Sequence, residues 1–150
     1  MRAAIAIVLF SSAAHADLTV NSAVLHSAQT DACPREPAQE IVCRGHHCDV
    51  SRAWLDRKLA NLSSVAPCAR IVPSFTHGRA RGFKLYAVRP GSLFARLLLQ
   101  NGDRIETING FDLTSPDKAL TVYTRLRAAT DFVVEIERRG RSINLDYSIR

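Results

Sequence analysis

The sequence is as informative in what it lacks as in what it contains. The apolar run Ala3–Phe10 is far shorter than the roughly 20 residues that a membrane-spanning helix needs. No Gly-x-Ser-x-Gly motif is present, which excludes the nucleophile elbow of one large hydrolase class, and no Cys-x-x-Cys pair favours thiol–disulfide exchange. No histidine lies beside a recognisable nucleophile motif. We therefore expect that the protein is not an enzyme and that it binds neither a cofactor nor a small-molecule substrate.

The N-terminus has the three parts of a secretory signal. Met1-Arg2 is positively charged, the apolar run follows, and Ala14-His15-Ala16 forms a small-residue cleavage site before Asp17. This pattern predicts a signal peptide over residues 1–16. The mature protein is then exported, and we expect it in the periplasm, with an association to the cell envelope left open.

Four cysteines follow the signal, and export decides how we interpret them. In an oxidising compartment an even number of cysteines predicts disulfides, and four of them allow three pairings. We favour Cys43 with Cys48, closing a tight loop, and Cys33 with Cys68. A structural metal site that uses the thiols together with His46 and His47 is the alternative, although adjacent histidines rarely bind one ion.

Basic residues outnumber acidic ones, with 20 Lys and Arg against 14 Asp and Glu and a formal net charge of +6. Such a balance is typical of proteins that bind nucleic acid, an anionic membrane or an acidic protein partner, and scattered arginines are also ordinary on a solvated surface. Nucleic acid is not expected, because the chain is exported and no aromatic residues are interleaved with the arginines. We expect protein partners.

The chain divides by composition. After the signal, residues 17–50 form a polar, cysteine-bearing leader that we expect to be loop-rich. Residues 51–67 form a lead-in helix and linker, with Ser51 as the cap of a helix that reaches Leu62. Residues 68–150 form the main domain.

The main domain alternates strands, turns and two helices. Ser92 and Ser115 are helix caps, Asn109-Gly110 is a tight turn, and the last strands alternate apolar with polar residues. The expected elements are strands at 69–73, 83–88 and 103–108, a basic loop at 78–82, helices at 92–98 and 115–128, and a closing hairpin at 132–149. This order predicts an α+β fold: a partly open antiparallel barrel or sheet with two helices, plus a disulfide-stapled N-terminal extension with one helix.

A sheet edge that lies beside a helix can bind an extended peptide as one more strand. The order of elements is that of a PDZ-type module, which uses this mode. We place the edge at the second strand and the helix wall at the main helix. The candidate peptide-binding residues are Arg81, Gly82, Phe83, Lys84, Leu85, Pro116, Leu120 and Tyr123. Two alternatives stay open: a basic loop that leads into an ordinary edge strand, and a Tyr123 that belongs to the core.

Five motifs carry a resemblance to one family. They are Gly82–Tyr86, Arg89–Phe94, Leu99–Asp103, Ile108–Gly110 and Ser115–Leu120. With these motifs, residues from about 69 to 150 resemble the PDZ domain of type II (general) secretion pathway protein C. The resemblance implies a periplasmic component that links an outer-membrane secretin with inner-membrane platform proteins, or that contacts exoprotein peptides.

The chain departs from that family at two places. Family members carry an N-terminal transmembrane helix where this chain has a cleavable signal and the cysteine-bearing leader, so tethering and secretin docking do not follow. Leu98 also stands where the family commonly has Gly, and its β-carbon opposes a left-handed helix end. An exported PDZ adaptor that presents peptides to a protease or another envelope partner is the alternative function.

Export and disulfide formation can be tested together on the protein recovered from the cell envelope. We expect an intact mass that begins at Asp17 and no alkylation of any cysteine without reductant. Mass spectrometry before and after reduction measures both. A mass that retains Met1, together with four alkylated thiols, would contradict the export argument.

Overall fold

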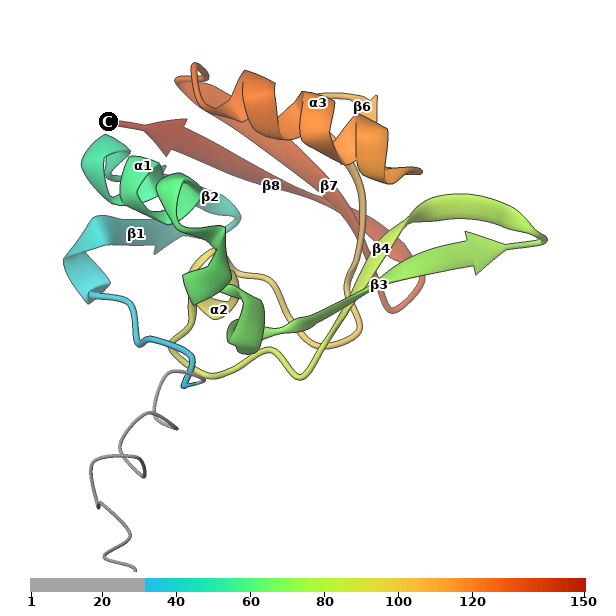
Figure 1. The fold of residues 1–150 in the computed structure, drawn as a ribbon, viewed down its shortest axis with the longest axis horizontal. Coiled ribbons are helices and arrows are strands. Elements are labelled where there is room, and N and C mark those ends of the chain that lie inside the picture. Colours follow the sequence, from blue (N-terminus) through green and yellow to red (C-terminus); the bar gives the residue numbers. More distant parts are fainter. Residues whose placement is uncertain (1–31) are drawn as a thin grey trace, which may run out of the picture. The chain divides into compact units, whose positions relative to one another are not determined.

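The computed structural model describes residues 32–150, shown as the coloured ribbon in Figure 1. The strands are β1 (Ile41–Arg44), β2 (His47–Val50), β3 (Arg70–Thr76), β4 (Arg79–Tyr86), β5 (Arg104–Ile108), β6 (Phe111–Asp112), β7 (Asp131–Arg138) and β8 (Arg141–Ile149). The α-helices are α1 (Arg52–Ala60), α2 (Leu93–Arg96) and α3 (Pro116–Leu126). Short 3-10 helices occupy Ala38–Glu40, Leu62–Ser64 and Ala66–Cys68. No helix in this part of the chain has the length and apolar character needed to cross a membrane.

All eight strands form one sheet in the order β1-β2-β8-β7-β5-β4-β3, and β6 pairs with β5. Every pairing is antiparallel except that of β2 with β8, which is parallel. The α+β class, the open sheet and the stapled extension with its own helix are therefore confirmed. The parallel pair is the one departure from the antiparallel sheet that the sequence predicts.

Local signals place the helices as expected. The hydroxyls of Ser51, Ser92 and Ser115 each accept a hydrogen bond from the main-chain N–H three residues later, at the start of α1, α2 and α3. Asn109 and Gly110 both have positive φ and turn the chain between β5 and β6. Such turns match the twist of the strands that they join.

The end of the cysteine-bearing leader forms a hairpin, where the sequence predicts a loop. Strands β1 and β2 pair directly, with Cys43 opposite Cys48, and β2 then adds to the end of β8. Ile41, Cys48 and Val50 are buried in the main core. Their burial against β8 explains why four-residue strands form here, although their local pattern is too short to predict them.

The core unites the extension with the rest of the molecule. Trp54 and Leu55 of α1 are buried in the same cluster as Leu85, Ile136 and other residues of the main sheet. The main-chain N–H of Arg52 donates to Arg150 O, and that of Arg150 donates to Val50 O. Residues 32–150 therefore form one packed unit, because neither the extension nor the sheet encloses this core by itself.

The predicted basic loop at 78–82 is instead mostly strand, since β4 begins at Arg79. Gly82, with φ +105°, lies where the main chain of β4 runs close to Ile105 of β5. A β-carbon at Gly82 would lie 2.0 Å from the carbonyl oxygen of Ile105. The close approach of the two main chains therefore requires glycine at this position. The sequence analysis predicts a peptide-binding role for Gly82, whereas the structure gives it this structural role.

Leu98 adopts φ +62° at the end of the α2 turn, although its β-carbon opposes this left-handed conformation. Its carbonyl accepts a hydrogen bond of 2.8 Å from the guanidinium of Arg138. The left-handed turn thus forms with leucine in place of glycine, and Arg138 binds the carbonyl that the turn presents.

Replacing Gly82 with Ala tests the close approach of β4 to β5. We expect Gly82→Ala to lower the free energy of unfolding by about 3 kcal/mol, because a methyl group there adds a backbone clash to the cost of positive φ. Gly78→Ala is the matched control: Gly78 has φ +74° with no atom within 4 Å of an added β-carbon. It should cost only about 1 kcal/mol. Urea unfolding measures both, and equal losses would refute the close-approach argument.

Candidate protein-binding edge

The strand predicted to be the free edge lies inside the sheet. Residues 83–86 of β4 pair with β3 on one side, and Phe83 and Lys84 pair with β5 on the other. Leu85 is fully buried. The prediction that this strand offers its main chain to a peptide is therefore wrong. The strand that has a single partner at this end of the sheet is β3.

The hydrogen bonds of Leu85 decide which way the main chain of β3 points. The N–H of Leu85 donates to Asp103 O, and its carbonyl accepts from Gly102 N, each at 2.8 Å. Both groups thus face away from β3. Ile71 lies directly opposite Leu85, so this is a non-hydrogen-bonded pair, and the N–H and C=O of Ile71 point outward.

The same alternation applies two residues further along. Pro73 lies opposite Phe83, so its nitrogen and carbonyl also point outward. Proline has no N–H to donate, and it is found in sheets mainly on the outer side of edge strands. The outer edge of β3 therefore offers one donor and two acceptors between Ile71 and Pro73. Within the described residues no other strand uses them.

Apolar side chains accompany this edge. Ile71 and Pro73 lie on the same face of the sheet as the buried Leu85, because opposite residues share a face. Nevertheless Ile71 is 49% exposed, and Phe75, beyond a bulge in the strand, is 66% exposed. The face of the sheet that is buried in the core at β4 is therefore exposed to solvent where it continues onto β3.

The remaining predicted residues of β4 are only partly available. Arg81 is exposed and forms an ion pair of 3.3 Å with Glu106. Phe83 is half-buried between β3 and β5. The ammonium group of Lys84 lies 5.9 Å from the ring centroid of Tyr86.

The predicted helix residues belong to α3, which begins at Pro116. Leu120 is 64% exposed. Tyr123 is half-buried, and its hydroxyl donates a hydrogen bond of 2.8 Å to the carbonyl of Leu59 at the end of α1. This bond gives Tyr123 a structural role, joining α3 to α1, although the described core cluster does not include it. A contact between Leu120 and a ligand stays a prediction.

Two pockets lie near the predicted site, and neither includes a residue of β3. A pocket of about 170 Å³ opens between β6 and α3, lined by Phe111, Asp112, Lys118, Thr121 and Val122. A second, of about 270 Å³, contains Arg81 and opens between β4, β5 and β6. The exposed side chains of Ile71 and Phe75 make the edge of β3 an open surface.

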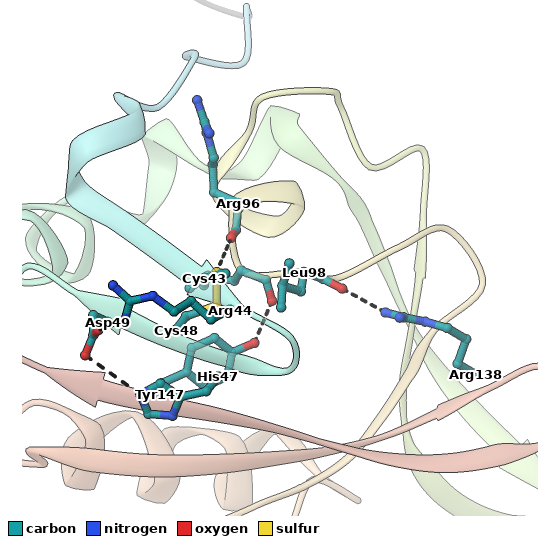
Figure 2. Close-up of a disulfide and its surroundings, with 10 residues drawn as sticks. Cys43, Arg44, His47, Cys48, Asp49, Arg96, Leu98, Arg138 and Tyr147 are labelled. Atoms are coloured by element: carbon teal, nitrogen blue, oxygen red, sulfur yellow. Dashed lines mark hydrogen bonds and ion pairs between the residues drawn. A yellow bond between two sulfur atoms is a disulfide. The ribbon is translucent and has the colours of Figure 1, made fainter.

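Both favoured disulfides are present. Cys33–Cys68 joins the extension to the residue two positions before β3, and Cys68 is fully buried. Cys43–Cys48 joins β1 to β2, and Figure 2 shows Cys43 facing the main chain of Arg96. Because the sulfurs of Cys43 and Cys48 are bonded to each other, they offer no thiolate ligands for the alternative metal site.

A buried ion pair supports the segment that binds Leu85. The carboxylate of Asp103 is fully buried and accepts two hydrogen bonds from Arg138, at 2.8 Å and 2.7 Å. These bonds raise the pKa of Arg138 above its usual value. Arg138 therefore stays charged and fixes residues 98–103, on which the orientation of β4 depends.

No protein-family model and no curated protein matches the chain. Solved structures do. The PDZ domain of EpsC from Vibrio cholerae is 22% identical over 64% of this chain and 91% of that one, with a TM-score of 0.49. The PDZ domain of the pullulanase C protein of the type II secretion system from Klebsiella pneumoniae, in complex with fatty acid, is 23% identical over 63% and 98%, with a TM-score of 0.45. A second structure of the EpsC PDZ domain from Vibrio cholerae is 23% identical over 53% of this chain and 92% of that one, with a TM-score of 0.41.

The similar structures are PDZ domains. At these identities and TM-scores the likeness carries no argument about what this chain binds. The function is argued below from the edge of β3 itself.

The role of Tyr123 can be separated from ligand binding by its hydroxyl group. We expect Tyr123→Phe to lower the free energy of unfolding by about 1 kcal/mol, because the carbonyl of Leu59 loses its partner. Tyr86→Phe is the control: Tyr86 is exposed, and its hydroxyl makes no hydrogen bond to residues 32–150. Urea unfolding of the two variants compares them, and indistinguishable stabilities would exclude the helix-joining role.

Proposed function

We propose that this protein is a non-catalytic, periplasmic binding module that captures an extended polypeptide along the outer edge of β3. The observation that carries the proposal is the outward direction of the Ile71 main chain, fixed by the bonds of Leu85 on the far side of β4. An unpaired edge is the usual receptor for strand addition. The resemblance to type II secretion protein C supports a place in protein secretion, with a secretin, platform protein or exoprotein as partner.

The exposed side chains of β3 support the same mode of binding. An added strand would place alternate side chains over Ile71 and Pro73, and would bury apolar surface that is now open to water. The affinity would be modest, because the edge between Ile71 and Pro73 has a single donor. Leu120 of α3 is the proposed further contact.

Hydrogen exchange at one amide tests capture directly. The probes are two nine-residue peptides with blocked ends, one alternating Val with Ser and one alternating Val with Glu. We expect at least one of them to slow exchange of the Ile71 amide in the disulfide-bonded protein, because that N–H gains a carbonyl partner. The Val72 amide, which faces β4, serves as the internal control and should not change. Measurement is by NMR at rising peptide concentration.

Two variants at the edge test the same hydrogen bonds in opposite directions. Ile71→Pro removes the outward donor and should weaken peptide binding roughly fivefold, the equivalent of about 1 kcal/mol. Pro73→Ala adds a donor and should tighten binding by a similar factor. Unfolding measurements confirm that both variants fold. If the Ile71 amide is unaffected at saturation, and neither variant alters the affinity, strand capture at β3 is wrong.

A further inference from the structure

The segment that contains the binding edge has an unusual charge pattern. From Arg57 to Gly102 the sequence contains eight Lys and Arg residues and no Asp or Glu. Five of these cations lie in or next to the β3–β4 hairpin: Arg70, Arg79, Arg81, Lys84 and Arg89. The hairpin therefore has to obtain any balancing charge from elsewhere in the fold or from a partner.

The described part of the chain supplies very little of that charge. Arg81 pairs with Glu106, but Arg104 shares the same carboxylate. Arg104 also binds Glu137, so the acids near the hairpin are already engaged. Within residues 32–150, Arg70 and Lys84 form no ion pair. They leave a net positive surface at the free end of the sheet.

The register of β3 and β4 sorts these side chains onto two faces. Arg70 lies opposite Tyr86, and Val72 lies opposite Lys84, so Arg70 and Lys84 share one face. Ile71 and Pro73 lie on the other face with the buried Leu85. The edge of β3 is thus apolar towards the core side and basic towards the solvent side.

We infer that the polypeptide bound at β3 is an extended segment in which acidic residues alternate with apolar ones; this rests on the proposed capture of a strand. Successive side chains of an added strand point to opposite faces of the sheet. Its apolar residues then cover Ile71 and Pro73. Its carboxylates lie beside Arg70 on the adjacent strand, and the long side chain of Lys84 adds positive charge on the same face, one strand further in. Opposite charges on neighbouring strands stabilise pairing, and like charges oppose it.

An anionic membrane is the other occupant that a basic surface with exposed Ile71 and Phe75 could attract, and the edge argues against it. The outward N–H and C=O groups of β3 would lose water in the hydrocarbon region without gaining hydrogen-bond partners. A polypeptide strand supplies those partners. The main-chain groups and the charges therefore favour the same class of ligand.

Peptides that differ only in charge test the inference. The probes are the Val–Glu, Val–Ser and Val–Lys nine-residue peptides with blocked ends, titrated into the disulfide-bonded protein. We expect Val–Glu to bind about three- to tenfold more tightly than Val–Ser, and Val–Lys to bind most weakly, in keeping with a cross-strand charge pair at Arg70 and a longer-range attraction from Lys84. Raising NaCl should weaken Val–Glu binding and leave Val–Ser binding nearly unchanged.

A pair of double variants locates the charge effect. Arg70→Gln with Lys84→Gln should reduce Val–Glu affinity to that of Val–Ser, without changing Val–Ser affinity. Arg44→Gln with Arg127→Gln lowers the net charge equally, at exposed positions outside the hairpin, and should leave the preference intact. Equal losses from both double variants would mean that only net charge acts, and would overturn the inference.

Each remaining result decides between the inference and the proposed function. Equal affinity for Val–Glu and Val–Ser, with the Ile71 amide protected by both, keeps strand capture and overturns the acidic preference. No protection by any peptide overturns both. Binding to phosphatidylglycerol vesicles without protection of Ile71 assigns the surface to a membrane. Concentration-dependent protection of Ile71 in the protein alone, with dimerisation in sedimentation, assigns it to a second copy.

Discussion

The hydrogen bonds between Leu85 and residues 102–103 determine the character of the whole binding edge. They direct the N–H and C=O of Leu85 away from β3. Because Ile71 lies opposite Leu85, the N–H and C=O of Ile71 then point outward. Asp103 is in turn fixed by Arg138, which also binds the carbonyl of Leu98. A buried ion pair in the interior thus controls which atoms the protein presents at its surface.

The N-terminal extension is part of the domain and not an appendage. It supplies buried residues from β1, β2 and α1, and it pairs with the last strand of the sheet. Cys33–Cys68 ties it to the chain just before β3. The edge strand therefore starts from a covalently fixed point, while the far end of the β3–β4 hairpin lies beyond the last pairing with β5.

Local chemistry allowed much of this fold to be predicted. Serine caps, the Asn109-Gly110 turn and the alternation of the final hairpin depend on residues close in sequence, and the structure confirms them. The edge was misplaced because it depends on pairings between distant segments. β4 has neighbours on both sides, and Gly82 serves its contact with Ile105. One signal was available: Pro73 within a short strand is typical of an edge. The short strands β1 and β2 gave no comparable signal.

The proline at the centre of the edge has a kinetic consequence. A strand bound beside Pro73 cannot complete an unbroken ladder, so few bonds have to break before it leaves. The missing donor at Pro73 also opposes edge-to-edge pairing between copies of this strand. We expect a short residence time for any polypeptide bound at β3. Such an edge is suited to transient binding of a polypeptide and not to its stable retention.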